Sequence, residues 1–132
     1  MTSNADDVRR ISSGATWELV VGYSRAVVAG PYVEVSGTTA PEAGDSAYEQ
    51  TRAALAKIGV ALADAGVGFA DVVRTRMFVT DITRWEEYGK AHGDVFGDVL
   101  PASTMVEVSA LIDPAMLVEV EATAYRRGAP CP

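Results

Sequence analysis

Residues 103–125 read STMVEVSALIDPAMLVEVEATAY and contain the tripeptide Val-Glu-Val twice, at 106–108 and at 118–120. Both copies lie in runs rich in β-branched residues, which favours strands. Asp113 and Pro114 interrupt the apolar pattern between them, so we predict two strands, at about 103–109 and 117–125. Each copy places a glutamate inside an apolar strand. Whether that glutamate faces the core, solvent or another subunit indicates what each face of the sheet contacts.

Three more strands are predicted upstream. Gly30-Pro31 separates two apolar runs and indicates a β-hairpin of roughly 25–29 and 32–36. The run VVRTRMFVT at 72–80 alternates as a strand does, with Thr75 on one face and Arg76 on the other.

Two amphipathic helices connect these strands. Ser46 and Glu49 have the spacing of a capping box, and apolar residues recur at a near-helical period until the chain reaches Gly66. Thr83 and Glu86 repeat the capping-box spacing at the start of a second helix, which carries His92.

The predicted order is ββαβαββ, an α+β fold in which two helices cover one face of a single sheet. The 132 residues are enough for one domain with a core and too few for two ordinary domains. We therefore expect an N-terminal tail at 1–15, one domain at 16–127 and a C-terminal tail at 128–132.

The phase of the strands predicts two unlike sheet faces. Aliphatic side chains are expected to meet the helices: Val106, Val108, Val118 and Val120. The opposite face would combine Arg74, Arg76, Glu107, Glu119 and Glu121 with Phe78, Met105 and Leu117. Such a face is too charged for a core and rather apolar for open water, so we predict an interface between subunits.

Composition excludes several functional classes. Eleven basic and eighteen acidic side chains give a net charge of −7, and no basic stripe is present, which disfavours a nucleic-acid partner. The single cysteine, Cys131, and the single histidine, His92, disfavour a metal site. The sequence has no apolar run long enough for a membrane span or a signal peptide, so we expect a cytoplasmic protein without a membrane partner.

Five segments in this order resemble one known family: GYSRA at 22–26, VSG at 35–37, VRTRMFVTD at 73–81, PASTMVEV at 101–108 and VEVEA at 118–122. The chain resembles the Rid family, the reactive intermediate deaminases, also called YjgF-like and often labelled endoribonuclease L-PSP. The resemblance implies a chorismate-mutase-like fold and a homotrimer with an inner β-barrel. It also implies a small-molecule cleft at each subunit interface, where enamines or imines are hydrolysed to a carbonyl compound and ammonia without metal or organic cofactor.

The same resemblance assigns candidate site residues. Tyr23 matches the tyrosine of the cleft, Ser36 the serine before glycine, and Glu119 the catalytic glutamate that orients water. Ser103 stands where the deaminating branch has arginine, and Met105 where that branch often has cysteine. The chain therefore looks like a divergent branch, because a hydroxyl cannot hold a carboxylate as a guanidinium does.

Alternatives remain open at most of these candidate residues. Glu119 would either orient water or belong to an ion pair at the interface. Tyr23 would either position a ligand or pack beside the hairpin, and Ser103 would either bind the polar end of a ligand or be an ordinary hydroxyl near a strand start. Arg76 would either replace the missing guanidinium or neutralise glutamates across the interface. His92 would either face the ligand or pack against its own helix layer. For the whole protein, a non-catalytic binding or regulatory trimer is the alternative to a deaminase, and the net charge disfavours an endoribonuclease.

Overall fold

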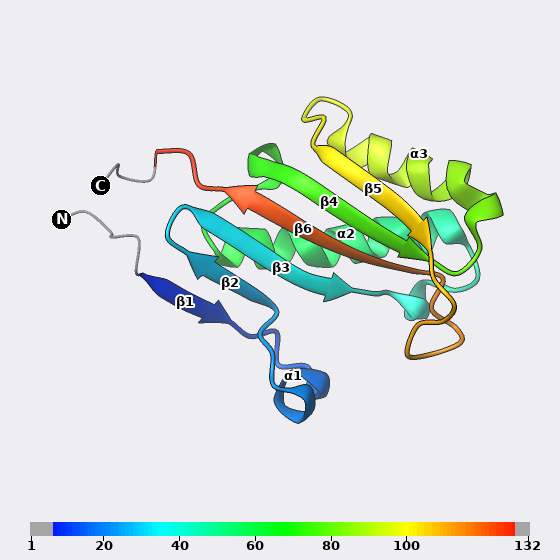
Figure 1. Cartoon of the computed structure of the whole chain (residues 1–132), viewed down its shortest axis with the longest axis horizontal. Coiled ribbons are helices and arrows are strands. Elements are labelled where there is room, and N and C mark those ends of the chain that lie inside the picture. Colours follow the sequence, from blue (N-terminus) through cyan, green and yellow to red (C-terminus); the bar gives the residue numbers. More distant parts are fainter. Residues whose placement is uncertain (1–6, 129–132) are drawn as a thin grey trace.

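The structure, a computed structural model, describes residues 7–128 and consists of one mixed sheet with two helices on one face (Figure 1). Its strands are β1 (Val8–Ile11), β2 (Ala26–Ala29), β3 (Tyr32–Thr38), β4 (Val72–Val79), β5 (Ala102–Glu107) and β6 (Val118–Tyr125). Its α-helices are α1 (Thr16–Val21), α2 (Ala47–Asp64) and α3 (Trp85–Phe96), and short 3₁₀ turns lie at 41–43, 69–71 and 82–84. The α+β fold with two helices covering one sheet is confirmed.

The strand order in the sheet is β1-β2-β3-β6-β4-β5. All neighbouring pairs are antiparallel except β4 and β5, which are parallel and are connected through α3. The second Val-Glu-Val strand, β6, therefore lies in the middle of the sheet, whereas the first, β5, forms an edge.

The core lies between the sheet and the helices. Val118 and Val120 of β6 are fully buried there, as are Leu55 and Ile58 of α2. Burial of such side chains stabilises the fold by about 1.5–3 kcal/mol each. The predicted orientation of β6, with its valines toward the helices, is thus confirmed.

The two helix starts differ from each other. Ser46 Oγ accepts a hydrogen bond of 3.1 Å from the Glu49 amide and caps α2, as predicted. The predicted capping by Thr83 is wrong, because Asp81 accepts from the Thr83 amide at 3.0 Å and begins the 3₁₀ turn that leads into α3. Aspartate caps helices as well as serine or threonine does, and it occurs two residues earlier.

The N-terminal region contains two elements that the sequence pattern does not predict, β1 and α1. Residues 8–11, which were expected in a tail, form β1 and pair with β2 in the register Val8 to Ala29 and Ile11 to Ala26. Three of the four residues of β1 are exposed, so the strand lacks the apolar alternation that would announce it. The short helix α1 was also missed. Residues 1–6 and 129–132 of the expected tails, with Cys131, lie outside the described residues.

The predicted phase of β5 is wrong. Its parallel register pairs Met105 with the buried Met77 and Ser103 with the buried Thr75, so Ser103, Met105 and Glu107 face the helix side. Val106 pairs with Phe78 on the opposite face and is 41% exposed. The prediction placed the valine side chains of this strand against the helices. At this edge of the sheet, the register with β4 instead determines which side chains of β5 face the helices. We call the face that the helices leave uncovered the open face.

Candidate functional site

The first group of predicted site residues lies around the start of the β2–β3 hairpin. Tyr23, Ser36 and Glu119 belong to it, together with Arg25 and Gly37, and we call these five residues the hairpin cluster. The Ser36 hydroxyl donates a hydrogen bond of 2.6 Å to the Ser24 carbonyl, which ties β3 to the segment that precedes β2.

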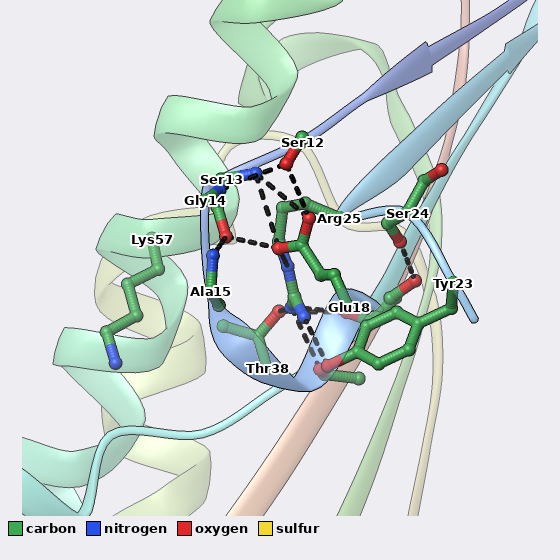
Figure 2. A network of polar contacts seen from close by, with 12 residues as sticks. Ser12, Ser13, Gly14, Ala15, Glu18, Tyr23, Ser24, Arg25, Thr38 and Lys57 are labelled. Carbon is green, nitrogen blue, oxygen red and sulfur yellow. Dashed lines mark hydrogen bonds and ion pairs between the residues drawn. The ribbon is translucent and has the colours of Figure 1, made fainter. Parts of the chain in front are cut away.

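Arg25 organises the hairpin cluster (Figure 2). Its guanidinium donates to the Gly37 carbonyl at 2.9 Å and to Thr38 Oγ1 at 2.7 Å through Nη1. Through Nη2 it donates to the Tyr23 hydroxyl at 3.3 Å, and its Cζ lies 5.6 Å from the centroid of the Tyr23 ring. Arg25 thus fixes both the tyrosine and the backbone at Gly37.

A buried carboxylate on α1 holds Arg25 in turn. Glu18 is 3% exposed, and its Oε2 lies 3.8 Å from Arg25 Nε. Ser12 Oγ donates to Glu18 at 2.9 Å, and both the amide and the hydroxyl of Ser13 donate to it as well (Figure 2). Burial alone would raise the pKa of Glu18, but the hydrogen bonds from Ser13 and Ser12 and the charge of Arg25 outweigh burial and lower the pKa below its usual value.

Glu119 lies on the open face beside Gly37. A β-carbon at Gly37 would lie 2.0 Å from Glu119 Oε2, so only glycine leaves room for this carboxylate. Burial and the nearby charge of Glu121 raise the pKa of Glu119 above its usual value, although Arg25 acts in the opposite direction. Within residues 7–128, no side chain or amide donates a hydrogen bond to the carboxylate, so its oxygens are available to a water molecule or a ligand.

The second group lies where α3 covers the β5 edge of the sheet, and it consists of Thr75, His92 and Ser103, which we call the edge cluster. Thr75 Oγ1 lies 2.8 Å from His92 Nε2 and donates a hydrogen bond of 2.8 Å to Ser103 Oγ. Burial lowers the pKa of His92, and its ring packs against Phe96 with centroids 4.6 Å apart. Met105 follows Ser103 on the same face of β5.

The two clusters occupy opposite faces of the sheet. Glu119 lies between the buried Val118 and Val120 and pairs with Phe78, so it points to the open face. Ser103 pairs with the buried Thr75 and points to the helix side. One small ligand therefore cannot contact Glu119 and Ser103 of the same chain.

Arg76 of β4 lies on the open face, where it pairs with Glu121 of β6. Its Nη1 is 3.5 Å from Glu121 Oε1, and it lines a shallow depression together with Ser36, Glu34 and Thr123. Within the described chain, the Arg76 guanidinium thus faces a glutamate of the neighbouring strand.

Three residues that build or support these clusters are absent from the predicted site residues: Arg25, Glu18 and Thr75. Arg25 directly follows Tyr23 and Ser24, at the predicted start of a strand. This position next to a candidate site residue could have identified Arg25 as a further candidate. Glu18 gave no signal, because α1 itself was not predicted. Thr75 was assigned to the correct face of β4, and the nearness of that face to His92 became visible only with the placement of α3.

Within residues 7–128, no group of three or more His, Cys, Asp or Glu side chains is arranged to hold a metal ion. None of the helices in this part of the chain combines the length and apolarity that a membrane crossing requires.

The mixed sheet, its two covering helices and the cluster around the β2–β3 hairpin define an α+β protein of the YjgF type. The family model of endoribonuclease L-PSP matches residues 15–126, and the chain belongs to this family of YjgF and Rid proteins.

Three relatives illustrate this membership. Rv2704 of Mycobacterium tuberculosis, a member of the YjgF/YER057c/UK114 family, is 54% identical and superimposes with a TM-score of 0.87 over 90% of this chain and 99% of that one. NMB1025 of Neisseria meningitidis, a YjgF protein, is 32% identical with a TM-score of 0.82 over 96% and 100% of the two chains. SCO2049 of Streptomyces coelicolor is 42% identical over 131 residues, which are 96% of each chain.

Proposed function

We propose that the protein is a homotrimer that binds a small polar metabolite in a cleft between subunits. The observation that carries this proposal is the separation of the candidate site residues onto opposite faces of the sheet. A second copy whose edge cluster meets the hairpin cluster of the first would complete the site. The charged and apolar open face, with Arg76, Glu121, Phe78 and Val106, supplies the surface for such an assembly.

We propose hydrolysis of an imine or enamine as the reaction of this cleft. Glu119 would orient the attacking water by accepting a hydrogen bond from it, since its carboxylate is partly desolvated and accepts no hydrogen bond within residues 7–128. Tyr23, held by Arg25, would donate a hydrogen bond to the ligand. The products are a carbonyl compound and ammonia. We place this activity in the cytoplasm.

A specific residue favours a second candidate function. Ser103 occupies the position at which the deaminating branch has arginine, and a hydroxyl cannot bind a carboxylate with two parallel hydrogen bonds. A trimer that binds a metabolite without converting it would retain the hairpin cluster and need no such group. This candidate differs from the first only in the absence of turnover.

The first experiment measures mass and activity together. Light scattering coupled to gel filtration gives the oligomeric state, and a monomer would contradict the shared cleft. Release of keto acid is then measured with 2-imino acids that an amino-acid oxidase generates from several amino acids. Glu119→Gln keeps the shape of the side chain and removes its charge, so the deaminase proposal expects loss of rate with an unchanged mass. Equal rates for both proteins on every substrate would favour the binding protein.

A further inference from the structure

The edge cluster forms a continuous chain of hydrogen bonds from the half-buried His92 to the exposed Ser103. Both links, His92 Nε2 to Thr75 Oγ1 and Thr75 Oγ1 to Ser103 Oγ, measure 2.8 Å. Thr75, the middle member, is completely buried. Its hydroxyl is therefore enclosed by two partners, one on α3 and one on β5.

The number of protons leaves this chain two directions. A threonine hydroxyl carries one proton, so if Thr75 donates it to Ser103, Thr75 accepts from His92 Nε2–H. Ser103 then keeps its own proton for a group in the cleft. In the reverse direction Ser103 donates to Thr75, Thr75 donates to Nε2, and the histidine carries its proton on Nδ1. The direction of the chain thus decides whether Ser103 donates to a ligand or accepts from it.

We propose that the edge cluster is a proton relay, in which Ser103 contacts the ligand and Thr75 and His92 set its donor or acceptor state. The ligand group that suits Ser103 is an uncharged polar group that exchanges protons, such as an imine nitrogen, a carbonyl or a hydroxyl, rather than a carboxylate. This inference rests on the proposed function, because it assigns the part of the cleft that the edge cluster contributes.

The relay has a defined task in imine hydrolysis. When water attacks the imine carbon, a C–O bond forms and the π electron pair moves to nitrogen. The step uses the reverse direction of the chain, in which the proton of the neutral His92 lies on Nδ1. Ser103 then accepts a proton from the water while its own proton moves to Thr75 and that of Thr75 to Nε2. The reverse movement delivers the proton to nitrogen and leaves a neutral carbinolamine.

A second cycle completes the reaction. The carbinolamine oxygen gives its proton to the relay and forms the C=O bond, the C–N bond breaks with its electron pair on nitrogen, and the relay protonates the departing ammonia. One imine and one water thus yield one carbonyl compound and one ammonia, and the relay returns to its starting state. Burial lowers the pKa of His92 and keeps its imidazole neutral, and in the Nδ1–H tautomer Nε2 is free to accept the proton.

Nuclear magnetic resonance tests the relay without a ligand. His92 is the only histidine of the chain, so its ring ¹⁵N shifts are unambiguous and report its tautomer. We expect the Nε2–H form in the parent protein and a shift toward the Nδ1–H form in Ser103→Ala, because Thr75 then donates to Nε2. In a Thr75→Val background, Ser103→Ala should leave the His92 shifts unchanged. Equal His92 shifts in the parent and in Ser103→Ala would overturn the relay.

Kinetics separate the relay from the proposed function. Thr75→Val should lower kcat for 2-imino acids by about 100-fold with little change in KM, and Thr75→Ser should restore it. Thr51→Val is the matched control, since Thr51 is equally buried but its hydroxyl donates to Ala47 of its own helix.

Each kinetic outcome has a separate meaning. An active parent protein with full activity in Thr75→Val would overturn the relay and leave the deaminase intact. A parent protein that is inactive on every 2-imino acid would overturn the hydrolytic steps, and the ¹⁵N shifts would still decide whether Ser103 and His92 are coupled.

Discussion

Gly37 and Glu119 are in such close contact that a β-carbon at position 37 would lie 2.0 Å from the carboxylate oxygen Oε2. Glu119 Cδ would lie 2.8 Å away, so rotation of the outer oxygen alone does not relieve the overlap. The glycine thereby determines where the candidate catalytic carboxylate can lie.

Gly37→Ala is therefore expected to displace the Glu119 side chain. Overpacking of this kind costs about 1–3 kcal/mol, so the variant should still fold at room temperature. The displaced carboxylate should lose its function in the cleft, and rates with 2-imino acids should fall as far as those of Glu119→Gln. Urea unfolding measures the loss of stability, and the release of keto acid from 2-imino acids measures the loss of rate. Gly68→Ala serves as a control, because nothing lies within 4 Å of its β-carbon and its φ of −140° is one that alanine adopts.

The elements of this fold could be predicted largely because alternation and helix caps are local. Ser46 predicts the start of α2, and the valines at 118 and 120 predict which face of the central strand β6 is buried. At the edges the local signal fails. The phase of β5 follows from its register with β4, and β1 is held by pairing with β2 while its side chains remain exposed.

The residues of the candidate site also fall into those that local sequence could predict and those that it could not. Tyr23, Ser36 and Glu119 could be named because they lie in recognisable segments. Arg25 lies in one of these segments too, but the roles of Arg25 and Thr75 could not be predicted, because they depend on partners on other elements: Arg25 bonds to Thr38, and Thr75 to Ser103, 28 positions away. Contacts between distant residues are set by the packing of whole elements, and a strand pattern contains no information on them.

Glu18→Ala is expected to destabilise the protein strongly. The substitution leaves Arg25 without its carboxylate in a site where the two side chains are only 13% and 3% exposed. Removal of one partner of a buried ion pair costs about 3–5 kcal/mol. Urea unfolding at neutral pH measures the loss.

The matched control for Glu18 is Glu42→Ala. Glu42 forms a shorter contact of 2.7 Å with Lys57, but both side chains are exposed. Exposed pairs contribute about 0–1 kcal/mol, so this variant should remain near the stability of the parent protein. A loss of equal size in the two variants would contradict the role given to burial at Glu18.

Stability should decrease as the pH falls below 6.5. Burial lowers the pKa of folded His92 below its ordinary value of 6.5, so the unfolded chain binds the proton more tightly than the folded one. The contribution of the neutral imidazole to the free energy of unfolding is complete above pH 6.5. It is lost as the pH falls through the pKa of His92 in the folded protein. His92→Gln should remove this dependence. Urea unfolding of both proteins between pH 7 and pH 5 checks it, and parallel pH profiles would show that His92 is not the cause.

Val106→Asp is expected to separate the subunits without unfolding them. Val106 lies on the open face of the edge strand β5, beside Phe78, and is already 41% exposed in the single chain, so a carboxylate there costs the fold of one subunit little. In an assembled trimer the same carboxylate would be buried without a partner, which is strongly unfavourable. Light scattering should show a monomer with a native circular dichroism spectrum. Val60→Asp, at a 64% exposed position of α2, should remain assembled, and a trimeric Val106→Asp protein would place the subunit contact on another surface.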